Sequence, residues 1–165
     1  MLKKLCFLTI AVLILASCNR EVVVWVNFDY AAFIHERDLW LASKPPNYRF
    51  HYESSGRQWD ADTIITVRNN EFYEQEPQAS SGIGESMFIL TIDDMYESLV
   101  NVYLQTHGKT FPTDYPYLKK VTVEYDLINH IPVEITSFYN SSLPEIFPAD
   151  SIFIRWVRMF EKLDE

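Results

Sequence analysis

Two short segments of this chain alternate apolar and polar residues strictly, and this pattern restricts the fold more than any other feature. Residues 48–53 read YRFHYE, and residues 120–125 read KVTVEY. Successive side chains of a β-strand point to opposite faces, so each segment predicts a strand with one buried and one exposed face. We therefore expect a sheet packed on one side, with His51 on the face opposite Tyr48, Phe50 and Tyr52.

Two other segments have helical periodicity. Residues 91–107 place apolar side chains on one face, Thr91 and Asp94 form a start that resembles a capping box, and Gly108 ends the segment. We expect the adjacent carboxylates Asp93 and Asp94 to cap this helix and complement its dipole. Residues 30–44 also place apolar side chains at helical spacing and predict a second helix. Asp29 can cap its start, and the two prolines at 45–46 end it.

The remaining segments favour strands. Residues 63–68 are β-branched, and Asn69-Asn70 suits a tight hairpin turn into residues 71–73. Residues 131–135 predict a strand. Residues 151–160 suggest a final strand, with a helix as the competing interpretation. Residues 22–26 fit an edge strand, the start of the first helix or a segment at a membrane surface. The order predicts an α+β fold of two α-β-β-β units forming one antiparallel sheet, with the helices packed on one face.

The N-terminus indicates export. Lys3 and Lys4 precede a charge-free apolar run too short to span a bilayer, as in a secretory signal peptide. Residues 15–18, Leu-Ala-Ser-Cys, resemble the bacterial lipobox, in which the cysteine is lipidated after cleavage. This resemblance implies a membrane anchor at Cys18. An ordinary signal peptide with a chance cysteine and an uncleaved anchor are the alternatives. Asn19, in place of the aspartate associated with inner-membrane retention, favours the outer membrane.

This interpretation divides the chain into a signal peptide (1–17), a lipidated cysteine with a short tether (18–29) and a single α+β domain (30–165). Cleavage leaves Cys18 as the only cysteine, so the mature chain has no internal disulfide. The full chain carries a net charge of −9, and cleavage removes two positive charges. This acidity argues against nucleic-acid binding, which needs a basic surface.

We find no residue pattern that predicts catalysis, a metal or a cofactor. The four histidines, at 35, 51, 107 and 130, include no i, i+4 pair, and His35-Glu36 would need remote partners to form a metal site. No serine lies in a G-x-S-x-G elbow. We therefore predict that the protein is not an enzyme.

The tyrosines give the best indication of a binding surface. Five of them fall on or next to predicted strands. If both helices cover one sheet face, the other is open, and aromatic side chains suit protein binding there. The competing interpretation is that the same rings are core residues. The predicted binding face consists of Tyr52, Tyr73, Tyr117, Tyr125 and Tyr139.

Several short motifs follow one another between Phe33 and Phe160. They are Trp40 followed by residues 46–50 (PNYRF), residues 63–68 before a turn, residues 91–94 (TIDD), and residues 123–126 (VEYD) before Ile131-Pro132 and Ile135. Their order is similar to that in a family of small bacterial lipoproteins catalogued as a domain of unknown function. The chain departs from the family at Asn70, where glycine is typical, and at His130-Ile131, where Gly-Tyr is typical. The resemblance implies no activity, ligand or catalytic residue.

The sequence is compatible with three classes of function. The first is a non-catalytic, membrane-tethered module that binds a protein of the cell envelope. The second is a carrier of a small ligand or lipid, with a pocket between helices and sheet lined by residues such as Phe33, Trp40, Leu99 and Tyr103. The third is an enzyme. We expect the first, because the sequence lacks a convergent catalytic set.

Overall fold

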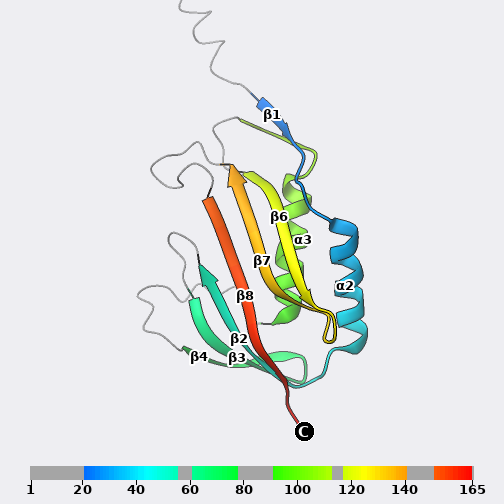
Figure 1. Cartoon of the computed structure of the whole chain (residues 1–165), viewed down its shortest axis with the longest axis vertical. Coiled ribbons are helices and arrows are strands. Elements are labelled where there is room, and N and C mark those ends of the chain that lie inside the picture. Colours follow the sequence, from blue (N-terminus) through cyan, green and yellow to red (C-terminus); the bar gives the residue numbers. More distant parts are fainter. Residues whose placement is uncertain (1–20, 56–60, 78–90, 113–116, 141–150, 165) are drawn as a thin grey trace, which may run out of the picture.

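The computed structural model describes residues 21–55, 61–77, 91–112, 117–140 and 151–164 (Figure 1). The elements follow one another along the chain as β1 (Glu21–Val24), α2 (Tyr30–Ser43), β2 (Tyr48–Ser55), β3 (Ala61–Arg68), β4 (Glu71–Pro77), α3 (Ile92–Thr106), β5 (Lys109–Pro112), β6 (Tyr117–Asp126), β7 (Ile131–Asn140) and β8 (Ser151–Lys162).

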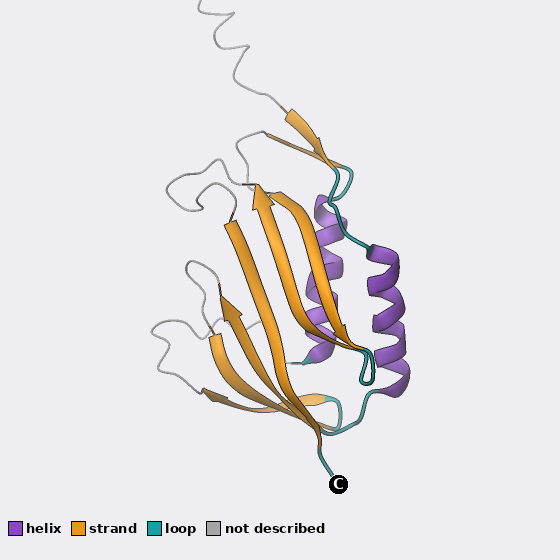
Figure 2. Cartoon of the chain, viewed as in Figure 1, coloured by secondary structure: helices purple, strands orange, loops and turns teal. Residues whose placement is uncertain are grey.

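Six strands form one antiparallel sheet in the order β4-β3-β2-β8-β7-β6. The last strand, β8, lies between β2 and β7, so the C-terminal segment joins the two halves of the chain. Both helices lie on the same side of this sheet, and no described helix or strand covers its other side, which we call the open face (Figures 1 and 2). The mixed α+β class and the antiparallel sheet are therefore confirmed.

The strand layout differs from the expected one. A strand, β1, precedes the first helix, and β5 comes between α3 and β6. These two short strands pair with each other in a separate antiparallel sheet. Val24 and Val26 are buried in the core, and Asn27 bridges to Lys120 of β6. Residues 21–28 thus belong to the folded domain and not to a free tether, because their apolar side chains complete its core.

Local sequence signals explain most element ends. The backbone N–H of Ala32 donates to the Asp29 carboxylate at 3.0 Å, which caps α2. Thr91 accepts from the N–H of Asp94 at 3.1 Å and caps α3. Asn69 and Asn70 both have positive φ, as a tight hairpin turn between β3 and β4 requires. Residues 151–162 form a strand, which confirms the first of the two interpretations.

The core lies between the helices and the sheet. Phe33 and Trp40 of α2 are buried, as are four apolar residues of α3. The buried positions of β2 are every second residue, as the alternation predicted. On the sheet, the side chains that face the helices include Tyr48, Phe50, Ile65, Val67, Ile135 and Val157.

Candidate functional site

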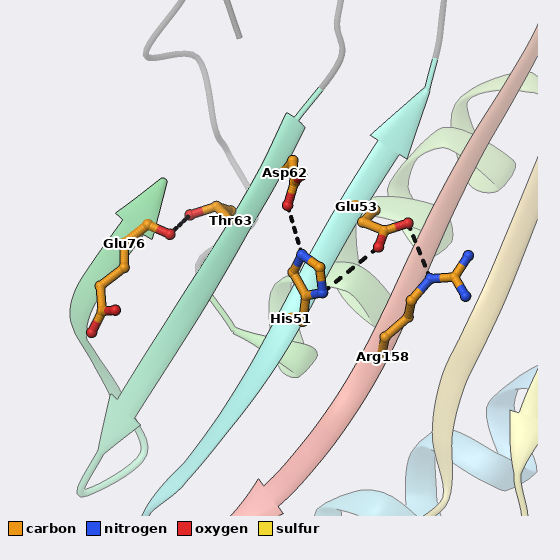
Figure 3. A network of polar contacts seen from close by, with 6 residues as sticks. All are labelled: His51, Glu53, Asp62, Thr63, Glu76 and Arg158. Carbon is orange, nitrogen blue, oxygen red and sulfur yellow. Dashed lines mark hydrogen bonds and ion pairs between the residues drawn. The ribbon is translucent and has the colours of Figure 1, made fainter. Parts of the chain in front are cut away.

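The open face of the sheet carries a chain of polar contacts that crosses three strands (Figure 3). His51 Nε2 lies 2.6 Å from Asp62 Oδ1 on β3, and His51 Nδ1 lies 3.6 Å from Glu53 Oε1. Arg158 on β8 donates from Nε to Glu53 Oε2 at 3.0 Å. The strand register explains why these four side chains are in contact, because His51 is paired with Arg158 and Glu53 is paired with Asp62.

The contacts continue onto β7. The Arg158 guanidinium lies 5.8 Å from the centre of the Trp156 ring, within the range of a cation–π contact. Trp156 Nε1 donates to Glu134 Oε2 at 3.0 Å, and Thr136 Oγ1 donates to Glu134 Oε1 at 3.1 Å. A connected polar network, the open-face network, therefore runs from Asp62 to Thr136 across β3, β2, β8 and β7.

Apolar side chains lie beside this network. Ile154 lies two residues before Trp156 on β8, so its side chain points to the same face. Phe138 of β7 pairs with Ile152, which lies four residues before Trp156, so Phe138 also lies on this face. Both are half-buried, and Lys120 Nζ lies 5.3 Å from the centre of the Phe138 ring. The open face thus combines paired charges with partly exposed aromatic and aliphatic surface.

Carboxylates flank the His51 ring within this network. Both ring nitrogens of His51 face carboxylate oxygens, so neither contacts a hydroxyl or thiol that it would have to activate. Within the described ranges, no group of three or more His, Cys, Asp or Glu side chains is arranged to hold a metal ion.

The five predicted tyrosines do not share the open face. Tyr52 is 3% exposed and points toward the helices, because it has the same strand parity as buried Tyr48 and Phe50. Tyr125 and Tyr139 also pack against the core, and burial raises the pKa of all three phenols. Tyr117 stacks on Phe111. Tyr73 alone is largely exposed, 61%, on the edge strand β4.

The residues predicted to line a ligand pocket are also packed. The rings of Phe33 and Tyr96 are 5.1 Å apart, and those of Trp40 and Tyr48 are 5.4 Å apart. Leu99 is buried, and Tyr103 stacks on Tyr30. Phe33, Trp40 and Leu99 belong to the core of the domain, and Tyr103 packs against it.

Asp93 has a different role from the expected cap. Thr91 and the backbone provide the cap of α3, while the Asp93 carboxylate accepts from Trp40 Nε1 at 2.6 Å and pairs with Lys44 Nζ. It therefore ties the start of α3 to the end of α2. No sequence pattern predicts this contact, because Trp40 and Asp93 are 53 positions apart.

His35 and Glu36, which could form a metal site only with remote partners, lie on α2. In the structure, the Glu36 carboxylate lies 2.9 Å from His130 Nδ1, in the turn between β6 and β7. Tyr96 donates from its hydroxyl to the His130 carbonyl at 2.8 Å. These two contacts hold the turn between β6 and β7 against α2 and α3.

On the helix-covered face, Arg155 of β8 is a polar residue that the sequence analysis did not single out. Its Nη1 donates to Ser98 Oγ of α3 at 3.2 Å, and its guanidinium lies 5.0 Å from the centre of the Phe153 ring. Its Nε is buried without a hydrogen-bond partner. The alternation of residues 151–158 indicates that Arg155 and Arg158 point to opposite faces of a strand. It does not indicate which helix or strand packs against each face.

Comparison with models of protein families, with curated proteins and with solved structures finds no match. Neither helix in the described part of the chain is long and apolar enough to cross a lipid bilayer.

Proposed function

We propose that this protein is a lipid-anchored module of the bacterial cell envelope that binds another protein through the open face of its sheet, without catalysis. The open-face network carries this proposal. Its Trp156 ring is half-buried, held by Glu134 on one side and covered by the Arg158 guanidinium. Tryptophan and arginine are the residues that most often dominate binding energy at protein interfaces.

The arrangement suits binding because its side chains are already fixed. Each of Glu53, Arg158, Trp156 and Glu134 makes a contact with a neighbouring strand. A partner that docks here would order few new side chains, which lowers the entropy cost of association. Paired charges of both signs around apolar surface favour a partner with complementary charges.

The anchor is the second part of the proposal. Cys18, the signal peptide and the lipobox lie outside the described residues. Support comes from the lipobox resemblance and from β1, which starts at Glu21, three residues after Cys18. An anchor at Cys18 would hold this end of the domain against the bilayer. Trp25 is 71% exposed just after β1, and tryptophan prefers the membrane–water interface.

We also infer that α2 with β2–β4 and α3 with β6–β8 are two α-β-β-β units, with the β1–β5 pair as an addition. The sheet order supports this, because each group of three strands occupies one half of the sheet. Membership in the family of small lipoproteins stays a prediction from the motif order, as does the outer-membrane location favoured by Asn19.

Affinity capture of the full chain from cross-linked bacterial cells tests the proposal. We expect one envelope protein to be enriched with the wild type and lost with Trp156→Ala. Leu104→Ala, at an exposed position of α3, is the matched control and should retain the partner. Equal enrichment with Trp156→Ala would refute the open face as the binding site. A Cys18→Ala chain that remains in the membrane fraction would refute the anchor.

A further inference from the structure

Arg155 lies on the helix-covered face, and no described carboxylate forms an ion pair with it. On β8 its Cα partners are Ser54 of β2 and Ile135 of β7, both buried. Phe153 lies beneath the guanidinium. The ion pairs among the described residues involve Arg37, Lys44, Arg49, His51, His130 and Arg158, but not Arg155.

The hydrogen bonds of Arg155 also leave most of its donors unused. A guanidinium has five N–H groups, and in the described structure only Nη1 donates, to Ser98 Oγ. The Ser98 hydroxyl in turn donates to the Met95 carbonyl at 3.0 Å, so Ser98 is an acceptor that holds the guanidinium in place. The buried Nε has no partner. A buried donor on a charged group without a partner is rare in folded proteins, because desolvation then goes uncompensated.

Two tyrosines share this site. The charge of Arg155 acts on both Tyr52 and Tyr139, which lie on β2 and β7 on either side of β8. Burial raises the pKa of both phenols, and the Arg155 charge opposes this rise only in part. Both hydroxyls therefore stay protonated and neutral at physiological pH. They add no negative charge to the site, and the Tyr52 hydroxyl hydrogen-bonds with the Ser54 side chain.

We propose that Arg155, with Tyr52 and Tyr139, binds the carboxylate group of a ligand between α3 and the sheet. Arg155 has no carboxylate partner in the described part of the chain and its buried Nε has no acceptor, so an oxyanion would complete its hydrogen bonds. The Tyr139 hydroxyl, and the Tyr52 hydroxyl that already hydrogen-bonds with Ser54, would be further polar groups beside that oxyanion. The planar fork of arginine matches a carboxylate with two parallel bonds. The apolar neighbours Phe153 and Val157 favour a carboxylate on an apolar body over a fully hydrated inorganic anion.

This inference goes beyond the proposed protein-binding role. The two sites lie on opposite faces of the sheet, so either can fail without the other. The same carboxylate chemistry occurs in a small organic acid and at the C-terminus of a peptide, and the experiment below separates these sources.

The test measures the melting temperature of the full chain in a non-ionic detergent with increasing benzoate, with benzamide as the neutral analogue. Anything that binds only the folded state raises the melting temperature with its concentration. We expect a saturable rise with benzoate and none with benzamide. A dipeptide, Ala-Phe, with a free or an amidated C-terminus forms the peptide arm. A larger rise with the free dipeptide than with benzoate identifies a peptide terminus, and the reverse identifies a small acid.

Arg155→Met should weaken benzoate binding at least tenfold, whereas Arg158→Met, on the same strand and the opposite face, should change it less than twofold. Tyr139→Phe keeps the ring, removes one donor and should weaken binding severalfold, so the proposal stays testable if Arg155→Met does not fold. The proposal is wrong if no carboxylate gives a saturable rise, if inorganic phosphate gives an equal one, or if Arg155→Met responds like the wild type.

Discussion

Arg155 and Arg158 lie three residues apart on β8 and point to opposite faces of the same sheet. Arg158 is exposed, donates to Glu53 and covers Trp156. Arg155 faces the helices, where it meets a serine, a phenylalanine and two protonated tyrosines. An arginine is thus a member of a connected polar network on one face and, among the described residues, a cation without an ion-pair partner on the other. The difference shows that the facing layer, and not the residue type, decides what an arginine does.

If the helix-covered face holds the fold together and the open face does not, core truncation should have the largest effect. Phe50 is fully buried on that face. We expect Phe50→Ala to lower the free energy of unfolding by about 3–5 kcal/mol, since it removes apolar contacts and leaves a cavity. Urea denaturation measures this. The neighbouring Arg49→Ala, on the open face, should cost less than about 1 kcal/mol. Similar losses at both positions would refute the distinction between the faces.

The next largest effect concerns the link between the helices. Asp93→Ala leaves the Trp40 indole N–H and Lys44 without their acceptor, and we expect a loss of about 1–3 kcal/mol. The same denaturation experiment checks it. Asp38→Ala, at an exposed carboxylate of α2, is the control and should stay within about 0.5 kcal/mol of the wild type. A cost at Asp93 no greater than at Asp38 would mean that the link is dispensable.

Alkaline pH should weaken the helix-covered face selectively. Burial raises the pKa of Tyr96 and Tyr48 above the ordinary value of 10.0. A phenol whose pKa is raised in the folded state stabilises the fold fully below pH 10.0, and this stabilisation is lost as pH rises above it. Each such tyrosine contributes up to about 1.4 kcal/mol of loss per pH unit.

Tyr96→Phe removes one of these titrations, so the fall in unfolding free energy above about pH 10 should be shallower by about one proton. Urea unfolding at a series of alkaline pH values measures the slope. The variant also loses the hydrogen bond to the His130 carbonyl, which lowers its stability at neutral pH without changing the slope. An unchanged slope would show that Tyr96 does not stay protonated when folded.

The smallest effect on stability should come from Arg158→Met on the open face. Its bond to Glu53 is at the surface, and such ion pairs contribute about 0–1 kcal/mol. Binding should respond much more strongly, because the variant uncovers Trp156 and unpairs Glu53. Denaturation and affinity capture on the same variant separate the two effects. A large loss of stability with full retention of the partner would reverse our assignment of the two faces.

The sequence alone determined the local structure. Asp29 and Thr91 cap the helices, Asn69-Asn70 turns the chain between β3 and β4, and the alternation of residues 48–53 sets which side chains are buried. These features depend on residues within a few positions of one another. The same alternation already implied that Tyr52 is buried with Phe50, so the predicted tyrosine face conflicted with it.

Only the tertiary structure decided which strands are neighbours. The position of β8 between β2 and β7 brings Arg158 to Glu53, and Trp156 to Glu134, over 105 and 22 residues of sequence. It also places Arg155 between β2, which carries Tyr52, and β7, which carries Tyr139. A period of two residues fixes the face of a side chain but not the strand beside it, because pairing depends on how the whole chain packs around one core.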